Sequence, residues 1–458
     1  MKIAIIGTGI SGYGAYLRFR ENSNLNSITF YNYGETVAKK TISFGNLPNI
    51  KLPEKKEFAL NLKKINSINS KFCIRYSNTT GGLSDFWSGS VFPFTNKELI
   101  KRNLGVLKDG YKKLSKFLTI SGNAKQFLKI YPKYYLKNNI KSINALKYID
   151  LLNSVKFKKF KLESGDNRIL NTANCIYCGN CFKGCENEVI FRPVNKFIGA
   201  NVVSKEIKLI KKIGSKWHLI DYQDKLINQY DVIFLGLGTT NTIKLLINSE
   251  LLDPRNIEIY DSNAIFFPLK INNKTSIYED NFGFANKIIK IQSQIGINYD
   301  SQISIVPFNH FFSYSIFGKW IGNLIKSFLL SKFALGCFFS SAQDANTFRF
   351  NKKNQLYLAH DGSDRAIKTL KKIIYEINEN NTIYKFLNLF SKSESSSHYS
   401  SNLLKNKNSF YKTCNYKENL FIIDGNMFPG KPSSQPNSFS IMAGAFTLID
   451  QFLIKHKI

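Results

Sequence analysis

The sequence is poor in acidic residues, and this shortage sets its charge. Asp and Glu together number 32 against 64 Lys and Arg, which gives a formal net charge of +32 at pH 7. Such an excess of basic residues is typical of proteins that bind nucleic acid or an anionic membrane surface. The basic residues are mostly lysines, however, scattered singly or in pairs such as Lys39-Lys40, and no arginine-rich block occurs. We therefore expect a solvated basic surface and no specific nucleic-acid site.

Long apolar runs are also missing. A transmembrane helix needs about 20 consecutive apolar residues. The nearest approach, between Phe311 and Ser340, is interrupted by Lys319, Lys326 and Lys332. Its helical spacing favours a core-facing helix, with a peripheral membrane contact as the alternative.

The sequence shows neither a secretory signal nor a disulfide framework. An apolar strand begins at the first residues, without a charged leader, apolar segment and cleavage site. The seven cysteines are an odd number, and four of them lie within eleven residues. We expect a cytoplasmic protein, with the inner face of the membrane as an alternative location.

A glycine-rich turn follows the first expected strand. Residues 2–6 are mostly apolar, a turn with three glycines follows them, and residues 13–20 suit a helix. In such a unit the first glycine permits the tight turn, the second lets backbone amides approach a pyrophosphate, and the third allows close helix packing. The pattern predicts a dinucleotide site formed by Gly7, Gly9, Ile10, Ser11 and Gly12.

The acidic residue that usually holds the adenosine ribose is absent. It is expected at the end of the second strand, about 20 residues beyond the turn. This chain has Asn32 there. An asparagine can still hydrogen-bond a ribose hydroxyl, although less strongly than a carboxylate. Glu35 is close in sequence, but we expect it to point elsewhere.

A second unit of the same kind lies late in the chain. Residues 231–235 form an apolar strand, Gly236 and Gly238 follow it, and residues 241–248 suit a helix. We therefore expect the chain to return to the N-terminal domain after a long insertion. Within that insertion, residues 97–152 favour helices.

The later part of the chain has a different pattern. Short alternating apolar runs between residues 256 and 350 predict antiparallel strands that wall a substrate space. Residues 391–408 are rich in Ser and Lys and are typical of a loop, although they contain His398.

Four stretches carry a resemblance to a known family. They are the N-terminal glycine turn, Thr80–Gly89 with its Gly-Gly-Leu-Ser, Tyr230–Ser249, and Phe421–Phe446. Within the last, Ile423–Pro429 matches the pattern Val-Asp-x-x-x-Phe-Pro. In this order and spacing they resemble the glucose-methanol-choline (GMC) oxidoreductases, whose bacterial branch includes members with a Cys-rich segment.

The resemblance implies an α/β fold. It consists of a Rossmann-like FAD-binding domain and a discontinuous α+β substrate domain that contains an antiparallel sheet. We expect the first domain to take residues 1–110, 165–265 and 395–458, and the second to take 111–164 and 266–394. By the same resemblance FAD is contacted by Gly7, Gly9, Ile10, Ser11, Gly12, Asn32, Gly81, Gly82, Ser84, Gly236, Gly238, Asp424 and Pro436.

His398 is the candidate general base. The family has a histidine that faces the flavin shortly before the C-terminal signature, and His398 occupies that place here. Alcohol oxidation requires loss of the hydroxyl proton while hydride leaves carbon, and an imidazole can accept that proton near neutral pH. His310 is the alternative base.

The family's second catalytic position is His or Asn before a proline. Here it is Gln435, which keeps a donor and an acceptor and can orient the substrate hydroxyl. Asn437, two residues later, is a competing candidate.

Four cysteines have the C-x2-C-x2-C-x3-C spacing of bacterial ferredoxins, although Glu186 replaces the proline that follows them there. They are Cys175, Cys178, Cys181 and Cys185. A [4Fe-4S] cluster, a zinc site and a metal-free family segment all stay open. The fourth cluster ligand would be Cys185 itself or one of the distant Cys73, Cys337 and Cys414.

These features together predict an FAD-dependent oxidoreductase. It would oxidise a small-molecule alcohol, or a sugar, to a carbonyl by hydride transfer, and a cluster would favour a dehydrogenase over an oxidase. The sequence does not identify the electron acceptor. Two alternatives stay open: a flavin-dependent amine or carbon-carbon dehydrogenase, and a non-catalytic basic protein that binds a membrane or nucleic acid.

Overall fold

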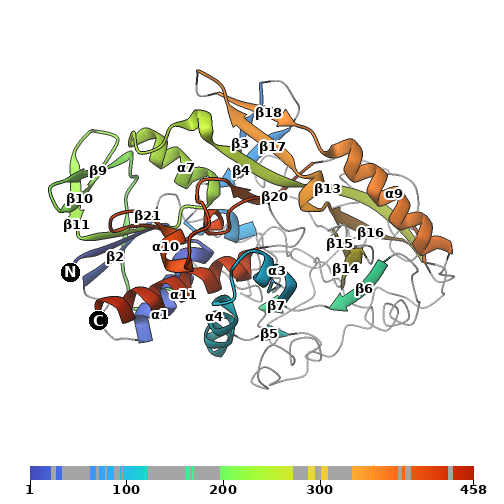
Figure 1. Ribbon diagram of the computed structural model, residues 1–458, viewed down its shortest axis with the longest axis horizontal. Coiled ribbons are helices and arrows are strands. Elements are labelled where there is room, and N and C mark those ends of the chain that lie inside the picture. The colour runs from blue at the N-terminus through green and yellow to red at the C-terminus, as the bar shows by residue number, and fades with distance from the viewer. Residues whose placement is uncertain are drawn as a thin grey trace, which may run out of the picture.

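The computed structural model contains a mixed, mostly parallel sheet with flanking helices and a separate antiparallel sheet (Figure 1). This confirms the predicted α/β fold with a Rossmann-like part and an antiparallel sheet. The structure describes residues 1–21, 27–32, 62–68, 72–77, 80–86, 93–94, 96–118, 120–121, 160–165, 168–169, 196–271, 287–293, 301–307, 333–353, 355–379, 384–386, 394–431 and 437–457.

The mostly parallel sheet, in which only the edge strand β21 is antiparallel among the described strands, is built around the N-terminal strand β1 (Ile3–Ile6). It pairs in parallel with β2 (Ile28–Asn32) on one side and β12 (Val232–Leu235) on the other. Every residue of β1 and β12 is buried, as expected for strands covered on both faces. The sheet order is β21-β22-β12-β1-β2-β8, with β8 (Asn201–Ser204), β21 (Asn415–Lys417) and β22 (Leu420–Ile422). The sheet thus unites the beginning, middle and end of the chain.

Helices pack closely on this sheet. The C-terminal helix α11 (Ser438–His456) lies along α1 (Ile10–Glu21), and Gly14 permits the contact because a Cβ there would overlap with the carbonyl oxygen of Met442. Asp450 of α11 accepts from Arg18 of α1 at 2.7 Å and from Lys113 at 2.6 Å. The other helices nearby are α3 (Asn96–Lys101), α4 (Leu107–Leu114), α7 (Thr239–Asn248) and α10 (Phe410–Cys414).

Small sheets and turns complete this part. Three antiparallel strands form one sheet, β9 (Leu209–Ile213), β10 (Lys216–Ile220) and β11 (Leu226–Tyr230). The others are the pairs β3 (Leu62–Asn66) with β4 (Cys73–Ser77) and β5 (Ile120–Ser121) with β7 (Arg168–Ile169). The short 3-10 helices are η3 (Gly82–Phe86), η4 (Ser115–Phe117), η10 (Pro254–Asn256), η11 (Ala342–Asp344) and η12 (Gly425–Met427).

The large antiparallel sheet is organised by the long strand β13 (Glu258–Ile271). This strand runs unbroken through residues 265 and 266, where we expected the chain to change domain, and pairs with four other strands. The remaining elements are β6 (Phe160–Gly165), β14 (Lys287–Ser293), β15 (Ser301–Pro307), β16 (Phe333–Phe339), β17 (Asn346–Phe350), β18 (Leu356–His360), α9 (Ser363–Glu379), β19 (Tyr384–Phe386) and β20 (Glu394–Ser401).

Two local predictions differ from the structure. Residues 394–401 form strand β20 and not a loop, because they pair with β13 and the hydroxyls of Ser396 and Ser400 have tertiary partners. The end of the apolar segment at residues 311–340 is strand β16, while residues 308–332 lie outside the described ranges. Of the predicted helical stretch 97–152, residue 119 and residues 122–152 are likewise outside them. Among the helices that the structure describes, none is long and apolar enough to cross a membrane.

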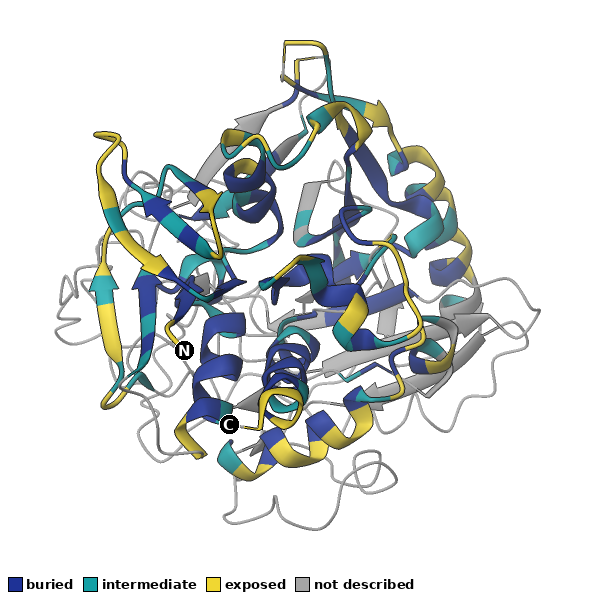
Figure 2. Cartoon of the chain, turned by 60° about the vertical axis from the view of Figure 1, so that its left-hand side comes forward, coloured by how far each residue is buried: buried dark blue, intermediate teal, exposed yellow. Residues whose placement is uncertain are grey.

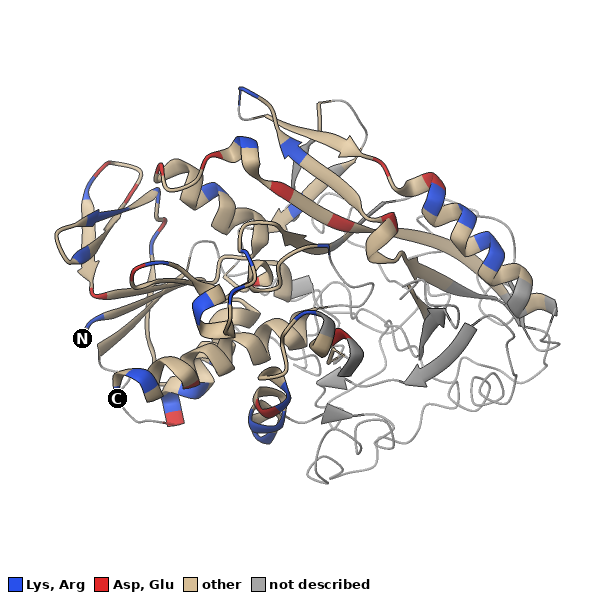
Figure 3. Cartoon of the chain, viewed as in Figure 1, with Lys and Arg blue, Asp and Glu red and all other residues tan. Residues whose placement is uncertain are grey.

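Buried residues lie between the packed helices and sheets, and basic residues are spread over several elements. Figure 2 shows buried residues concentrated where helices meet the sheets and exposed residues along outer strands and helix faces. In the view of Figure 3, Lys and Arg lie on several separate elements, α9 among them, and not on one surface.

The α1–α11 contact generates a stability prediction. Gly14→Ala should lower the free energy of unfolding by about 1–3 kcal/mol, because the added Cβ forces the two helices apart. Gly105→Ala is the matched control, since a Cβ there has no atom within 4 Å. Urea denaturation measures both, and equal stability of the two variants would contradict the close approach.

Candidate functional site

Two glycine turns from distant parts of the chain lie in direct contact. Gly7, at φ +117°, directly follows β1, and a Cβ there would overlap with the carbonyl oxygen of Gly236 in the turn after β12. Ser11 Oγ donates to the same oxygen at 3.0 Å, across 225 positions of sequence. A Cβ at Gly12 would overlap with the Gly7 carbonyl oxygen. The two predicted turns therefore form one structure, from which α1 and α7 begin.

The segment at residues 80–86 packs on the first of these turns. Thr8 Oγ1 donates to the carbonyl oxygen of Thr80 at 2.5 Å. A Cβ on Gly9 would lie 3.1 Å from the Gly81 carbonyl oxygen, which also accepts from Ser84 Oγ. Gly82 has φ +58°, a conformation that favours glycine. The structure thus brings the predicted Gly-Gly-x-Ser segment beside the dinucleotide turn.

Asn32, the last residue of β2, has an unsatisfied side-chain oxygen. Its Oδ1 is buried and finds no hydrogen-bond partner within the described part of the chain. Its main-chain carbonyl is satisfied by Lys205 N at 3.0 Å. An unpaired buried acceptor costs about 1–3 kcal/mol, and a ligand hydroxyl would supply the missing donor. The sequence predicts the adenosine ribose at this position.

Asp424 joins the C-terminal signature to the second turn. It is buried, and its carboxylate accepts from Thr242 Oγ1, from Asn426 N at 3.0 Å and from Asn426 Nδ2 at 2.8 Å. Gly238 adds a backbone hydrogen bond. Burial raises the pKa of Asp424 to about 6, although these hydrogen bonds oppose the rise. Its contacts within the protein are structural, and its contact with FAD stays a prediction.

Strand β20 carries His398 and is attached to the Rossmann-like part. The carbonyl oxygen of Tyr399 accepts from Thr239 Oγ1 at 3.2 Å, in the first turn of α7. Tyr399 OH accepts from Arg75 N at 2.6 Å. Ser401 Oγ donates to Asn426 Oδ1 at 2.5 Å. These bonds fix the neighbour of His398 against the helix that follows the second glycine turn.

A chain of hydroxyls on β13 and β20 holds the backbone at His398. The strand pairing is irregular here, with a register shift between Asp261 and Asn263. Ser396 Oγ donates to Asp261 Oδ1 at 2.6 Å, lies 2.9 Å from Ser262 Oγ, and accepts from His398 N at 3.1 Å. The irregularity is therefore stabilised by side chains on both strands.

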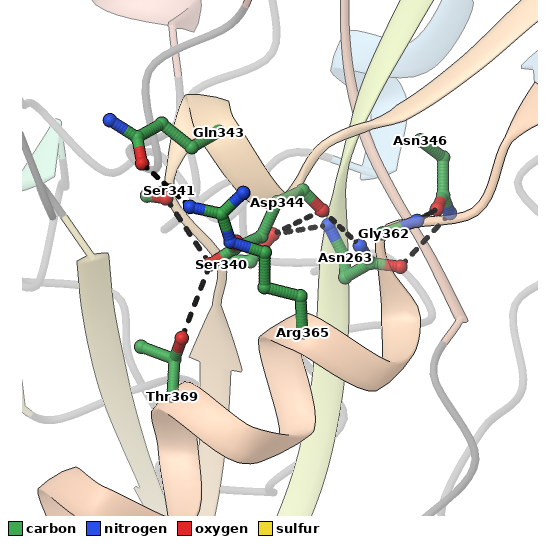
Figure 4. Close-up of polar contacts among 9 residues, drawn as sticks. All are labelled: Asn263, Ser340, Ser341, Gln343, Asp344, Asn346, Gly362, Arg365 and Thr369. Carbon is green, nitrogen blue, oxygen red and sulfur yellow. Dashed lines mark hydrogen bonds and ion pairs between the residues drawn. The ribbon is translucent and has the colours of Figure 1, made fainter.

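A buried carboxylate fixes β13 at the same point and anchors α9 to the sheet (Figure 4). Asp344 Oδ1 lies 2.9 Å from Arg365 Nε, and Oδ2 accepts from Ser341 Oγ and Thr369 Oγ1 at 3.3 and 3.4 Å. The Asp344 carbonyl oxygen accepts from Asn263 Nδ2 at 2.5 Å. Burial raises the pKa of Asp344, opposed by Arg365. The network holds Asn263, which borders the register shift.

The imidazole of His398 is held neutral and has an unsatisfied nitrogen. Its ring lies 5.1 Å from the ring of Phe339, centroid to centroid. Nδ1 is buried without a hydrogen-bond partner among the described residues. Desolvation lowers the pKa of His398 to about 4, so at neutral pH the ring is uncharged and able to accept a proton.

Several predicted site residues fall outside the described ranges. They are His310, Gln435, Pro436 and the four cysteines Cys175, Cys178, Cys181 and Cys185. Asn437 is described and is buried at the N-terminal cap of α11. Within the residues that the structure describes, no group of three His, Cys, Asp or Glu side chains could hold a metal. Cys337 and Cys414 are buried, and burial raises the pKa of Cys414 well above its usual value.

The residues that support His398 were not predicted from the sequence. Asp261, Ser262 and Asn263 are fully buried, although they are consecutive polar residues in a strand. A polar triplet between apolar strand residues was the available signal, since buried polar groups are rarely left without partners. Ser396 and Phe339 carried no comparable signal, because only the fold brings them to His398.

Known proteins share the fold but not the sequence. Neither a family model nor a curated protein matches the chain. Pyridoxine 4-oxidase from Mesorbium loti matches with a TM-score of 0.63 at 11% identity, over 98% of this chain and 99% of that one. Formate oxidase from Aspergillus oryzae RIB40 matches with a TM-score of 0.63 at 10% identity, over 100% and 98%. At these identities the likeness shows a common fold along nearly the whole chain.

The neutral imidazole predicts an acid-sensitive contribution to stability. The pKa of His398 is about 4 in the folded chain and 6.5 when unfolded, so the unfolded state takes up the proton first as the pH falls. The free energy of unfolding should therefore fall by about 3 kcal/mol more in the wild type than in His398→Asn between pH 7 and pH 4. Urea denaturation at each pH measures this difference, with His218→Asn as the control. Parallel curves for the wild type and His398→Asn would contradict the burial of the ring.

Proposed function

We propose that the chain is an FAD-dependent oxidoreductase of the GMC type that oxidises the CH–OH group of an alcohol to a carbonyl. The observation that carries this proposal is the attachment of the His398 strand to the helix after the second glycine turn, through Thr239 Oγ1 and the Tyr399 carbonyl oxygen at 3.2 Å. This bond joins the strand of the candidate base to the helix after a dinucleotide-type turn, which supports the proposal. A dinucleotide-binding scaffold without chemistry would not require such a base.

The residues present fit FAD. The first-turn N–H groups of α1, at Gly9 to Gly12, lack intrahelical acceptors and would hold the pyrophosphate. Asn32 Oδ1, buried without a partner in the described ranges, would accept from the adenosine ribose. Gly81, Gly82 and Ser84 lie beside the turn and would line the cofactor. Gly236, Gly238, Asp424 and Pro436 complete the proposed set.

The known neighbours support the same cofactor. The formate oxidase that shares this fold is described with a modification of its FAD. Both neighbours are named as oxidases. We propose the dehydrogenase form for this chain, in which a separate acceptor takes the electrons and the cysteine run holds a [4Fe-4S] cluster. Comparing turnover with oxygen and with an artificial acceptor decides between the two forms.

FAD, when bound, supplies the hydride acceptor. The protein's part is to remove the hydroxyl proton, and His398 can do so because its ring is neutral and Nδ1 is unpaired among the described residues. Ser396 and Asp261 position the backbone that carries the ring. Gln435 or Asn437 would orient the substrate hydroxyl through an amide.

Replacing the base tests the reaction. His398→Asn should lower kcat for alcohol oxidation by about 10²- to 10⁴-fold, since that is the usual contribution of a general base. The variant should still retain FAD. His218→Asn, in strand β10, is the control and should leave kcat unchanged. If His398→Asn oxidises alcohols at the wild-type rate, or amines are the better substrates of the wild type, the assigned reaction is wrong.

Replacing Asn32 tests the cofactor assignment independently of turnover. Asn32→Ala should weaken FAD binding by about 2- to 10-fold, the usual value of one neutral hydrogen bond. Asn201→Ala on the adjacent strand β8 is the matched control, because its side chain is exposed and bonded to Thr29 Oγ1 at 3.3 Å. Fluorescence titration of the apoprotein with FAD measures both. Equal affinities would remove Asn32 from the site.

A further inference from the structure

The two faces of the large antiparallel sheet differ in chemistry. Because successive residues of a strand point to opposite faces, the cross-strand rows define each face. One row consists of Ile265, Phe338 and Ile303, all fully buried and apolar. The adjacent row consists of Ala264, Phe339 and Gln302 and so ends in an amide.

An apolar face of a sheet is buried when a helix packs its own apolar side chains against it. Helix α9 contacts β13, β19 and η11, and its buried side chains are Ala366, Leu370, Ile373 and Ile374. They match a face made of Ile265, Phe338 and Ile303. The second face, which carries Phe339 and Gln302, is therefore available to the candidate site.

His398 identifies that second face as part of the candidate site. Its ring centroid lies 5.1 Å from that of Phe339. Phe339 is paired with Gln302 on the next strand, so their Cβ atoms are about 5 Å apart on the same face. Ala264, on the other side of Phe339, has only a methyl group and leaves room for the two rings to meet. The face thus presents His398, Phe339 and Gln302 in sequence across neighbouring strands.

Gln302 has an unused hydrogen-bonding group. The residue is fully buried, and its Nε2 donates to Ser304 Oγ at 3.3 Å. Its Oε1 is buried with no partner in the described part of the chain. Ser304 lies two residues further on and therefore on the same face, and its hydroxyl proton is available to a second acceptor. One acceptor and one donor therefore lie side by side, a few ångströms beyond Phe339.

We propose that Gln302 and Ser304 form a substrate subsite that binds a second hydroxyl group of the alcohol. This inference rests on the proposed function and narrows it to the substrate class. An amide oxygen accepts only from a donor, so the recognised group carries a proton, and a hydroxyl also accepts from Ser304. The substrate is therefore a diol, polyol or sugar, with one hydroxyl at His398 and another at Gln302. Phe339 lies between them and contacts the carbon skeleton.

A pair of small alcohols tests the subsite. Cyclohexanol and trans-cyclohexane-1,2-diol differ by one hydroxyl, and kcat/KM for each is measured on the FAD-loaded protein with an artificial acceptor, together with myo-inositol, sorbitol and D-glucose. The wild type should prefer the diol by about 10-fold or more. Gln302→Met keeps the length of the side chain and should abolish this preference by lowering kcat/KM for the diol toward that for cyclohexanol. Ser304→Ala should reduce the preference independently.

The matched control is Ser301→Ala. Ser301 Oγ is also buried without a partner among the described residues, but it lies on the opposite face of the same strand and should leave the preference intact. A wild type that oxidises both alcohols equally, or a Gln302→Met variant that still prefers the diol, would overturn the subsite and leave alcohol oxidation standing. If none of these alcohols is oxidised by the wild type, the proposed function fails and the subsite fails with it.

Discussion

The fold depends on the contact between two turns that have no room for side chains. Gly7 and Gly236 meet so closely that a single Cβ on the first would displace the backbone of the second. Ser11 Oγ stabilises the contact by donating a hydrogen bond of 3.0 Å to the Gly236 carbonyl oxygen. Because β1 and β12 are neighbours in register, this contact aligns the beginnings of α1 and α7 at one edge of the sheet. The same edge of the sheet holds the other parts of the candidate site. They are Asn32, the segment at residues 80–86 and the C-terminal signature.

The second requirement is the correct placement of a strand from the other sheet. Strand β20 crosses between the two parts because its serines bond in both directions, Ser396 to β13 and Ser401 to η12. Burying so many polar groups is costly unless each finds a partner. Where partners are found, the backbone is fixed, as at the register shift opposite His398. Where they are not, as at Asn32 Oδ1, His398 Nδ1 and Gln302 Oε1 within the described ranges, a ligand can supply them.

Local pattern was enough to predict the parts of the fold that local chemistry determines. The glycine turn after an apolar strand, the second strand at residues 231–235 and the antiparallel pattern after residue 256 are all present. Strand β20 was wrongly predicted as a loop because serines favour loops by propensity, and its strand structure comes from partners on β13. Gly14 carried no signal either, because its value lies in the approach of α11 from the far end of the chain. The candidate site also contains residues of both kinds. Asn32 was predicted from its spacing in the sequence. Ser396, Phe339 and Gln302 become neighbours of the site only through the register of the sheet.

We propose that the two glycine turns and the His398 strand enclose one flavin. The absorption spectrum of the purified protein tests it most directly, before and after anaerobic addition of an alcohol. We expect a yellow protein with the visible bands of oxidised flavin, which fade as the alcohol is consumed. A colourless protein that takes up no FAD on reconstitution would contradict it.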